Sequence, residues 1–383
     1  MKISLRLVVL AVLMMHSADA QWILSDNFNS HAQKGIQYVY NLEFEKAQTE
    51  FTYLTEHYPS HPAGKFFLAM IDWWSILMNV EDESKDDAFI AKLDDVIQLC
   101  DSLLDKNEND VTALFFKGGA LGFRGRLRAN RSSWIKAAND GRLALPIVQK
   151  AYAIAPDNKD ILLGMGIYNY YAAIIPERYL IVKPLMVFFP SGDKKKGIQQ
   201  LWEASLQAQF AAIEAKYFLL QLNYSYEYHY DTAYSIALSL LTQFPNNVVF
   251  QRYLGRSAFM LQKYEEASAV FAEIQKRCDA NQRGYSATIK REALYYRGVS
   301  EMNRSNLPAA LQFLYQSDSL CRVLDTEEQS GYMAMANLKV GMIYDLQGKR
   351  QDAVRQYQKV LDIKKFEQSH DLAHQYLKTP YSK

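Results

Sequence analysis

Residues 35–59 read GIQYVYNLEFEKAQTEFTYLTEHYP, and the spacing of a few small and large side chains within them decides the fold. Small and aromatic residues alternate in this stretch, and a proline ends it: Gly35, Tyr38, Ala47, Phe51 and Pro59. The first four positions return at the same spacing near the end of the chain, at Gly341, Tyr344, Ala353 and Tyr357. A further copy carries Gly255, Ala267 and Phe271. The chain therefore contains an internal repeat.

A period of about 34 residues with this pattern is typical of an array of helix–turn–helix hairpins. Each small residue lets two helices approach closely, and each aromatic residue fills the space beside that contact. We therefore expect an all-α superhelical solenoid of antiparallel helix hairpins over residues 21–383, as a single domain. The expected hairpins span 28–61, 62–108, 109–156, 157–210, 211–247, 248–281, 288–324 and 331–367, with a capping helix at 369–378.

The third and fourth hairpins depart from the regular spacing. In the third, the span that follows Gly118 is too long for one repeat. In the fourth, an insertion at 172–196 separates Gly164 from its continuation at Gly197. The insertion contains an apolar run that a lysine and a proline interrupt, and this run is too short to cross a bilayer. We expect the insertion to plug the groove of the superhelix; the alternative is a lip that contacts a partner or a membrane.

The composition is that of an ordinary folded protein. Of 383 residues, 49% are hydrophobic and 22% are charged, which is enough apolar material for more than one core. Lysine and arginine total 43 while aspartate and glutamate total 42, so the opposite charges nearly cancel. This balance gives no case for nucleic acid as a partner.

The first twenty residues have the pattern of a secretory signal peptide. Lys2 and Arg6 precede an apolar run, 7–15, and Ala18-Asp19-Ala20 supplies the small residues of a cleavage site. A membrane anchor, the alternative, needs about 20 apolar residues, and this run is much shorter. We expect residues 1–20 to be removed and the mature chain to act in a periplasm or elsewhere in the cell envelope.

Residues that could carry catalysis or bind a metal are few. Cys100, Cys278 and Cys321 are an odd number of cysteines without a CxxC motif, and we expect buried fillers; only the last two could form a disulfide. His370 and His374 lie one helical turn apart and could bind a metal, but exposed histidines on a terminal helix are the simpler interpretation. No phosphate-binding loop or nucleophile elbow occurs. We expect no enzyme activity, no cofactor and no metal.

Two groups of residues are candidates for contact with a partner. The first is a basic stretch in which Arg124, Arg128 and Arg131 share one helical face close to Trp134. Arginine forks suit an anionic or carboxylate-bearing partner, but ion pairing with the acidic residues of 81–95 would explain the same charges. The second group is an aromatic cluster of Tyr168, Tyr170 and Tyr171. We expect most of these rings to pack within the fold, and the ring of Tyr170 to line the groove and stack on a partner.

The repeat resembles the tetratricopeptide repeat superfamily over nearly all of the mature chain. This resemblance implies a right-handed superhelix whose concave face receives a peptide or a partner helix. The peptide-tail clamp of some cochaperone repeats needs paired lysine and asparagine on early first helices. Residues such as His31 and Ala32 stand there instead, so that activity is not implied.

The irregular centre resembles something narrower. Residues 164–171 read GMGIYNYY, and 189–193 read FPSGD. Together with Gly197 they are similar to a block found in exported bacterial repeat proteins of unknown role. They are also similar to a eukaryotic repeat family linked to the mitochondrial outer membrane and inclusion clearance. The signal peptide argues against taking over the location of that family.

We therefore expect a non-enzymatic protein-binding or scaffold module of the cell envelope. It would hold a peptide or partner protein on its concave face, with the irregular centre carrying the function because loops on a rigid scaffold concentrate binding residues. Two alternatives stay open: a glycan-binding receptor component, and a metal-dependent hydrolase that uses His370 and His374.

Overall fold

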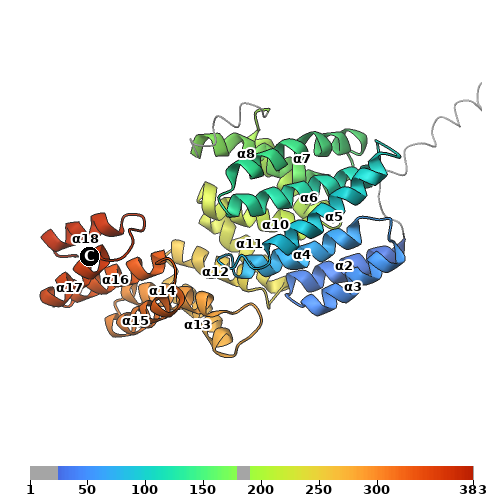
Figure 1. Ribbon diagram of the computed structural model, residues 1–383. Coiled ribbons are helices and arrows are strands. Elements are labelled where there is room, and N and C mark those ends of the chain that lie inside the picture. Colours follow the sequence, from blue (N-terminus) through green and yellow to red (C-terminus); the bar gives the residue numbers. More distant parts are fainter. Residues whose placement is uncertain (1–24, 179–189, 383) are drawn as a thin grey trace, which may run out of the picture. The chain divides into compact units, whose positions relative to one another are not determined.

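The structure is a computed structural model that describes residues 25–178 and 190–382 (Figure 1). All regular secondary structure within these residues is helical, with seventeen α-helices, one short π-helix and no β-strand. The prediction of an all-α, tetratricopeptide-like solenoid of antiparallel helix hairpins is confirmed. The expected signal peptide, 1–20, and the apolar run 179–189 lie outside the described residues.

Two helices fall in each range expected for a hairpin, and one in the range of the cap. Helices before residue 210 are α2 (Asp26–Tyr40), α3 (Phe44–His57), α4 (Ala63–Met78), α5 (Asp86–Leu104), α6 (Val111–Asn130), α7 (Trp134–Ile154), α8 (Ile161–Arg178) and α9 (Lys194–Gln207). The later helices are α10 (Ala212–Leu222), the π-helix η2 (Asn223–Glu227), α11 (Tyr230–Gln243), α12 (Val248–Met260), α13 (Tyr264–Asp279), α14 (Ala287–Asn303), α15 (Leu307–Leu324), α16 (Gly331–Leu346), α17 (Arg350–Leu361) and α18 (Ser369–Lys378).

The described residues form two compact units. The N-terminal unit holds 25–76, 80–178 and 190–219, and the C-terminal unit holds 77–79 and 220–382. Within each unit, paired helices of a hairpin pack on each other, as α6 does on α7 and α14 does on α15. Second helices also pack on the first helix of the next hairpin, as α5 does on α6 and α13 does on α14.

The small and aromatic positions of the repeat meet as the spacing predicts. A Cβ atom added at Gly35 would lie 2.2 Å from Cε1 of Phe51, and one added at Gly341 would lie 2.5 Å from Cε1 of Tyr357. Any larger side chain at these glycines would push the two helices of the hairpin apart. The repeat pattern is therefore a pattern of close helix contacts.

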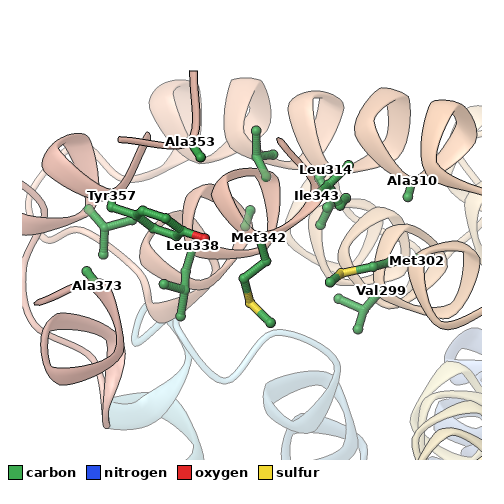
Figure 2. Close-up of a cluster of buried hydrophobic side chains, with 13 residues drawn as sticks. Val299, Met302, Ala310, Leu314, Leu338, Met342, Ile343, Ala353, Tyr357 and Ala373 are labelled. Carbon is green, nitrogen blue, oxygen red and sulfur yellow. The ribbon is translucent and has the colours of Figure 1, made fainter. Parts of the chain in front are cut away.

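The last hairpins of the C-terminal unit share one apolar core (Figure 2). Val299, Leu314, Leu338, Ile343 and Tyr357 are all less than 5% exposed. Burying each such side chain stabilises the fold by about 1.5–3 kcal/mol. The core extends to α18, because Ala373 packs in the same cluster. The terminal helix therefore covers an apolar face of the preceding hairpin.

The extra length of the third hairpin lies in its helices. Helix α6 has 20 residues and α7 has 21, and only residues 131–133 connect them. Ser132 adopts a positive φ of 56° in this tight turn. The additional residues of the third hairpin therefore extend two packed helices and do not form an inserted loop. In the fourth hairpin, α8 continues through Pro176 to Arg178, so the first residues of the expected insertion at 172–196 are also helical.

All three cysteines are buried and free, as expected for fillers, and Cys278 and Cys321 are not joined by a disulfide. Burial raises the pKa of Cys100 and Cys278 to about 12 and that of Cys321 to about 11, so their thiols stay protonated at neutral pH. Among the described helices, none combines the length and the apolar character needed to cross a membrane.

Candidate functional site

The basic stretch of α6 faces carboxylates of its neighbouring helices, and one of these carboxylates is fully buried. Asp140 of α7 has no exposed surface, and it accepts hydrogen bonds from Nη2 of Arg124 and from Nη1 of Arg128, both at 2.6 Å. Arg124 also donates through Nη1 to Asp94 of α5. Gly125 makes room for this cluster, since an added Cβ there would lie 3.1 Å from Cβ of Asp140.

Arg131, directly after α6, joins the start of α5 and the residues before it to the third hairpin. Its Nε donates to Oδ2 of Asp86 at 2.6 Å, and its Nη2 donates to Oδ1 of Asp86 at 3.0 Å. It also donates to the backbone oxygens of Val80 and Asp82. Arg124 and Arg131 thus pair with the 81–95 acids, the alternative that the sequence leaves open. Whether these arginines also hold a partner stays a prediction.

The tyrosine cluster lies on α8 and is engaged within the fold. Tyr170 has no exposed surface, so the expectation that its ring stacks on a partner is wrong. The hydroxyl of Tyr168 donates a hydrogen bond of 2.5 Å to the backbone oxygen of Pro190. Tyr171 is partly exposed and its ring centroid lies 5.4 Å from that of Tyr170. Trp134, the first residue of α7, is partly exposed as well.

The first helices of the N-terminal hairpins are covered by the chain itself. Residues 210–218 contact three of these helices, since Phe210 lies against Phe67 of α4 and Glu214 bonds to Tyr40 of α2 and Arg126 of α6. The segment is held at its start by Asp160, whose Oδ1 accepts the backbone N–H groups of Phe210 and Ala211 at 2.8 Å. This face is therefore occupied in the folded chain.

Arg126 sits at the centre of that contact. Its guanidinium carbon lies 4.2 Å from the ring centroid of Phe218 and 4.8 Å from that of Trp73. Its Nη1 donates to Oε1 of Glu214 at 3.1 Å, and the carboxylate is only 5% exposed. A partly buried cation between aromatic faces and a buried carboxylate stabilises this contact, because removing either charge leaves the other unpaired.

The C-terminal unit presents a different face on its first helices. We call it the arginine–tyrosine face: Arg252, Arg256, Glu292, Tyr224, Tyr253, Tyr296 and Tyr332. These residues come from η2, α12, α14 and α16, and all except Glu292 are partly exposed. Sequence reasoning missed this face because its hairpins are regular and its charges are not concentrated in one stretch.

Two arginines one helical turn apart hold one buried glutamate at this face. Arg252 donates through Nε and Nη2 to Oε2 of Glu292, at 3.1 and 2.6 Å. Arg256 donates through Nε to Oε1 and through Nη2 to Oε2, both at 2.6 Å. Burial alone would raise the pKa of Glu292, but the charges of the two arginines outweigh burial and lower it from 4.5 to about 2. Glu292 is therefore ionised at any physiological pH.

The tyrosines surround this ionic cluster. The ring centroids of Tyr224 and Tyr253 are 5.4 Å apart, and Tyr296 stacks on Phe271 at 4.8 Å. Burial is the main cause that raises the pKa of Tyr296 and of Tyr332, so their hydroxyls stay protonated and can donate hydrogen bonds. Partly exposed arginine and tyrosine side chains are the types that dominate the energy of protein interfaces.

The terminal histidines show no metal geometry. Nε2 of His370 lies 2.8 Å from the backbone oxygen of Ile363, which places that ring nitrogen against the protein. In the described part of the chain, no three histidine, cysteine, aspartate or glutamate side chains converge as metal ligands would. Among the described residues, no third side chain joins His370 and His374 as a possible metal ligand.

Comparison with known proteins gives a partial family match. Residues 159–285 match the family model described as Iml2/Tetratricopeptide repeat protein 39. This stretch runs from the start of α8 to the loop after α13 and contains the central block singled out from the sequence. No curated protein matches the chain.

Solved structures of repeat proteins align over most of the chain at low similarity. Yeast Tom70 is 12% identical with a TM-score of 0.40, covering 93% of this chain and 89% of its own. A tetratricopeptide repeat protein of Parabacteroides merdae is 13% identical with a TM-score of 0.34, covering 82% of this chain and 99% of its own. Human IFIT1, solved with PPP-AAAA, is 12% identical with a TM-score of 0.39, and the alignment covers 89% of this chain and 71% of IFIT1. These values are too low to transfer a ligand or partner from any of them.

Proposed function

We propose that the chain is a non-enzymatic scaffold that holds a segment of a partner protein on the first-helix, concave side of its C-terminal unit. The tetratricopeptide-like fold supports a role in protein interaction. The observation that carries the proposal is the convergence of Arg252 and Arg256 on buried Glu292 among partly exposed tyrosines. Such a rigid group of arginine and aromatic side chains loses little conformational freedom when a partner binds.

The N-terminal unit offers less for a partner on its first helices. Residues 210–218 already contact α2, α4 and α6 there. The charges of Arg124 and Arg128 are compensated by Asp140, which is fully buried. We therefore favour the arginine–tyrosine face over the irregular centre as the main contact. The six sequence-predicted residues other than the buried Tyr170 remain a second surface to test.

We also propose that the protein is exported to the cell envelope of a bacterium. Support comes from the basic start, the apolar run 7–15 and the small residues Ala18-Asp19-Ala20. N-terminal sequencing of the protein recovered from a periplasmic fraction should begin at or near Gln21. Recovery of the full-length chain from the cytosol would contradict this part of the proposal.

The binding role is tested by capture with variants. The mature chain, 21–383, serves as bait in envelope extract beside a variant that replaces Arg252, Arg256 and Glu292 by glutamine. We expect the wild-type bait to retain a partner in stoichiometric amount and the triple variant to lose at least nine tenths of it. A second variant, Arg322→Ala with Arg355→Ala, removes two arginines of α15 and α17 and should capture normally. Equal capture by all three baits would refute the proposed site.

A further inference from the structure

The arginine–tyrosine face keeps hydrogen-bond donors that the fold does not use. An arginine side chain has five N–H donors. Arg252 and Arg256 both bind Glu292 through Nε and Nη2. In the described residues, Nη1 of either arginine has no acceptor. The two side chains are 22% and 21% exposed, so neither is fully enclosed by the fold.

Glu292 fixes the position of both guanidinium groups. The carboxylate is 2% exposed and receives four N–H donors, which hold the two arginines side by side. Long arginine side chains ordinarily lose much rotamer freedom when they bind a ligand. Here the buried carboxylate has already ordered them, so a ligand that binds their outer edges loses less entropy.

The cluster also has an excess of positive charge. Arg291 pairs with Asp325 at 2.7 Å, and both are buried. Its guanidinium carbon lies 5.2 Å from the ring of Tyr332, so this pair adjoins the face. Arg252 and Arg256 carry two positive charges against the single negative charge of Glu292, so one further carboxylate would balance these three side chains. Charge-assisted bonds between arginine and carboxylate are among the strongest in proteins.

The tyrosines indicate what carries that carboxylate. Tyr224 and Tyr253 are partly exposed, their ring centroids lie 5.4 Å apart, and Tyr253 directly follows Arg252 on α12. Rings of this kind bury the apolar stem of a side chain or the backbone of a peptide, while their hydroxyls bond its polar groups. A peptide segment with an acidic side chain fits both features.

We propose that the outer edges of Arg252 and Arg256 bind a carboxylate of an acidic peptide segment, with Tyr224 and Tyr253 packing along that segment. This inference rests on the proposed function and names the chemistry of the partner. Arg124 of the sequence-predicted basic stretch lacks this property, because it uses its Nε, Nη1 and Nη2 on Asp94 and Asp140.

The test measures binding of a defined probe to the mature chain by fluorescence anisotropy. The probe is fluorescently labelled hexaglutamate with an amidated C-terminus. Hexaglutamine with the same ends is the uncharged control. Hexaalanine with a free C-terminus presents a single terminal carboxylate. We expect hexaglutamate to bind at low ionic strength, hexaglutamine to bind at least tenfold more weakly, and affinity to fall with added salt. Binding of hexaalanine as tight as that of hexaglutamate would assign the site to a chain terminus, still as a carboxylate.

Two variants distinguish binding at this site from attraction of the probe by the overall charge of the protein. The triple glutamine variant of Arg252, Arg256 and Glu292 avoids an unpaired buried charge and should bind hexaglutamate at least tenfold more weakly. The double variant at Arg322 and Arg355 loses more positive charge and should bind as the wild type does. Circular dichroism confirms that each variant is folded, and Arg256→Ala alone provides a second test if the triple variant is not.

The outcomes also distinguish this inference from the proposed function. Equal binding of hexaglutamate and hexaglutamine, or unchanged binding by the triple variant, would overturn the carboxylate assignment. Tighter competition by inorganic phosphate than by glutamate would overturn it as well, in favour of a phosphorylated ligand. If a partner is captured from envelope extract through this face but hexaglutamate does not displace it, the scaffold role stands and the carboxylate assignment fails.

Discussion

The hydroxyl of Tyr40 donates a hydrogen bond of 3.0 Å to Oε2 of Glu214, across 174 residues of sequence. Both side chains are buried, and Arg126 binds the other oxygen of the same carboxylate. This contact joins the first helix of the N-terminal unit to the segment that covers its first-helix side. The first-helix side of the N-terminal unit is thus covered by one of its own segments. For this reason the arginine–tyrosine face of the C-terminal unit is the surface that we propose for a partner.

Replacing Tyr40 by phenylalanine should lower the free energy of unfolding by about 1–2 kcal/mol, because a buried carboxylate oxygen loses its donor. Urea unfolding of the mature chain measures the change. Tyr38→Phe is the matched control, since the hydroxyl of Tyr38 has no hydrogen-bond partner among the described residues. Equal stability of the two variants would show that the Tyr40–Glu214 bond contributes nothing.

Replacing both Arg124 and Arg128 by alanine distinguishes the structural role of the basic stretch from the binding role expected from sequence. The structure predicts destabilisation by about 3–5 kcal/mol, because Asp140 is left charged and buried without a partner. Adding Asp140→Asn should restore part of that loss. Thermal melting and partner capture are measured together. Capture weakened tenfold with an unchanged melting temperature would support the sequence-based expectation instead.

Glu292 should make stability depend on acid pH. Its folded-state pKa of about 2 lies below the ordinary 4.5, so the folded state binds fewer protons between these values. The stabilisation is complete above about pH 4.5 and is lost as pH falls towards 2, amounting to roughly 3 kcal/mol. Glu292→Gln should flatten this part of the curve, whereas Glu265→Gln, at an exposed position, should not. Parallel curves for wild type and Glu292→Gln would contradict the assignment.

Lys339 of α16 should destabilise the fold at neutral pH. Burial lowers its pKa, and no ion pair with it is found in the described residues. The unfolded chain therefore binds more protons between the lowered pKa and the ordinary 10.5, so stability should rise with pH across that window. Lys339→Met should raise stability at pH 7 by about 1–2 kcal/mol and remove this rise. Lys276→Met, at an exposed site, is the control; equal effects of both would refute the prediction.

The sequence predicts the repeat contacts well because they are local. Gly341 and Tyr357 lie on the two helices of one hairpin, so the spacing that brings them together is visible in a single repeat. The helical extension of the third hairpin is harder to predict, because a long span between motif positions is equally compatible with a loop. Only the structure shows that a turn of three residues suffices there.

The candidate site is poorly predicted because ion pairing is not local. A dense run of arginines on α6 is conspicuous in the sequence, but the buried Asp140 that compensates it lies on another helix. Arg252 and Arg256 are inconspicuous, and Glu292, which orders them, lies on the first helix of the next hairpin. Charge density can be read from a sequence, whereas the donors that remain unused can be read only from a structure.

Photo-crosslinking from Tyr253 tests the central claim most directly. A benzoylphenylalanine is placed at Tyr253, on the arginine–tyrosine face, or at Val323, which is 71% exposed on a second helix of the same unit. Cells producing either variant are irradiated, and covalent adducts of the purified chain are identified. The account predicts one discrete partner adduct from position 253 and none from position 323. An adduct from position 323 alone, or from neither position while the partner still co-purifies, would contradict it.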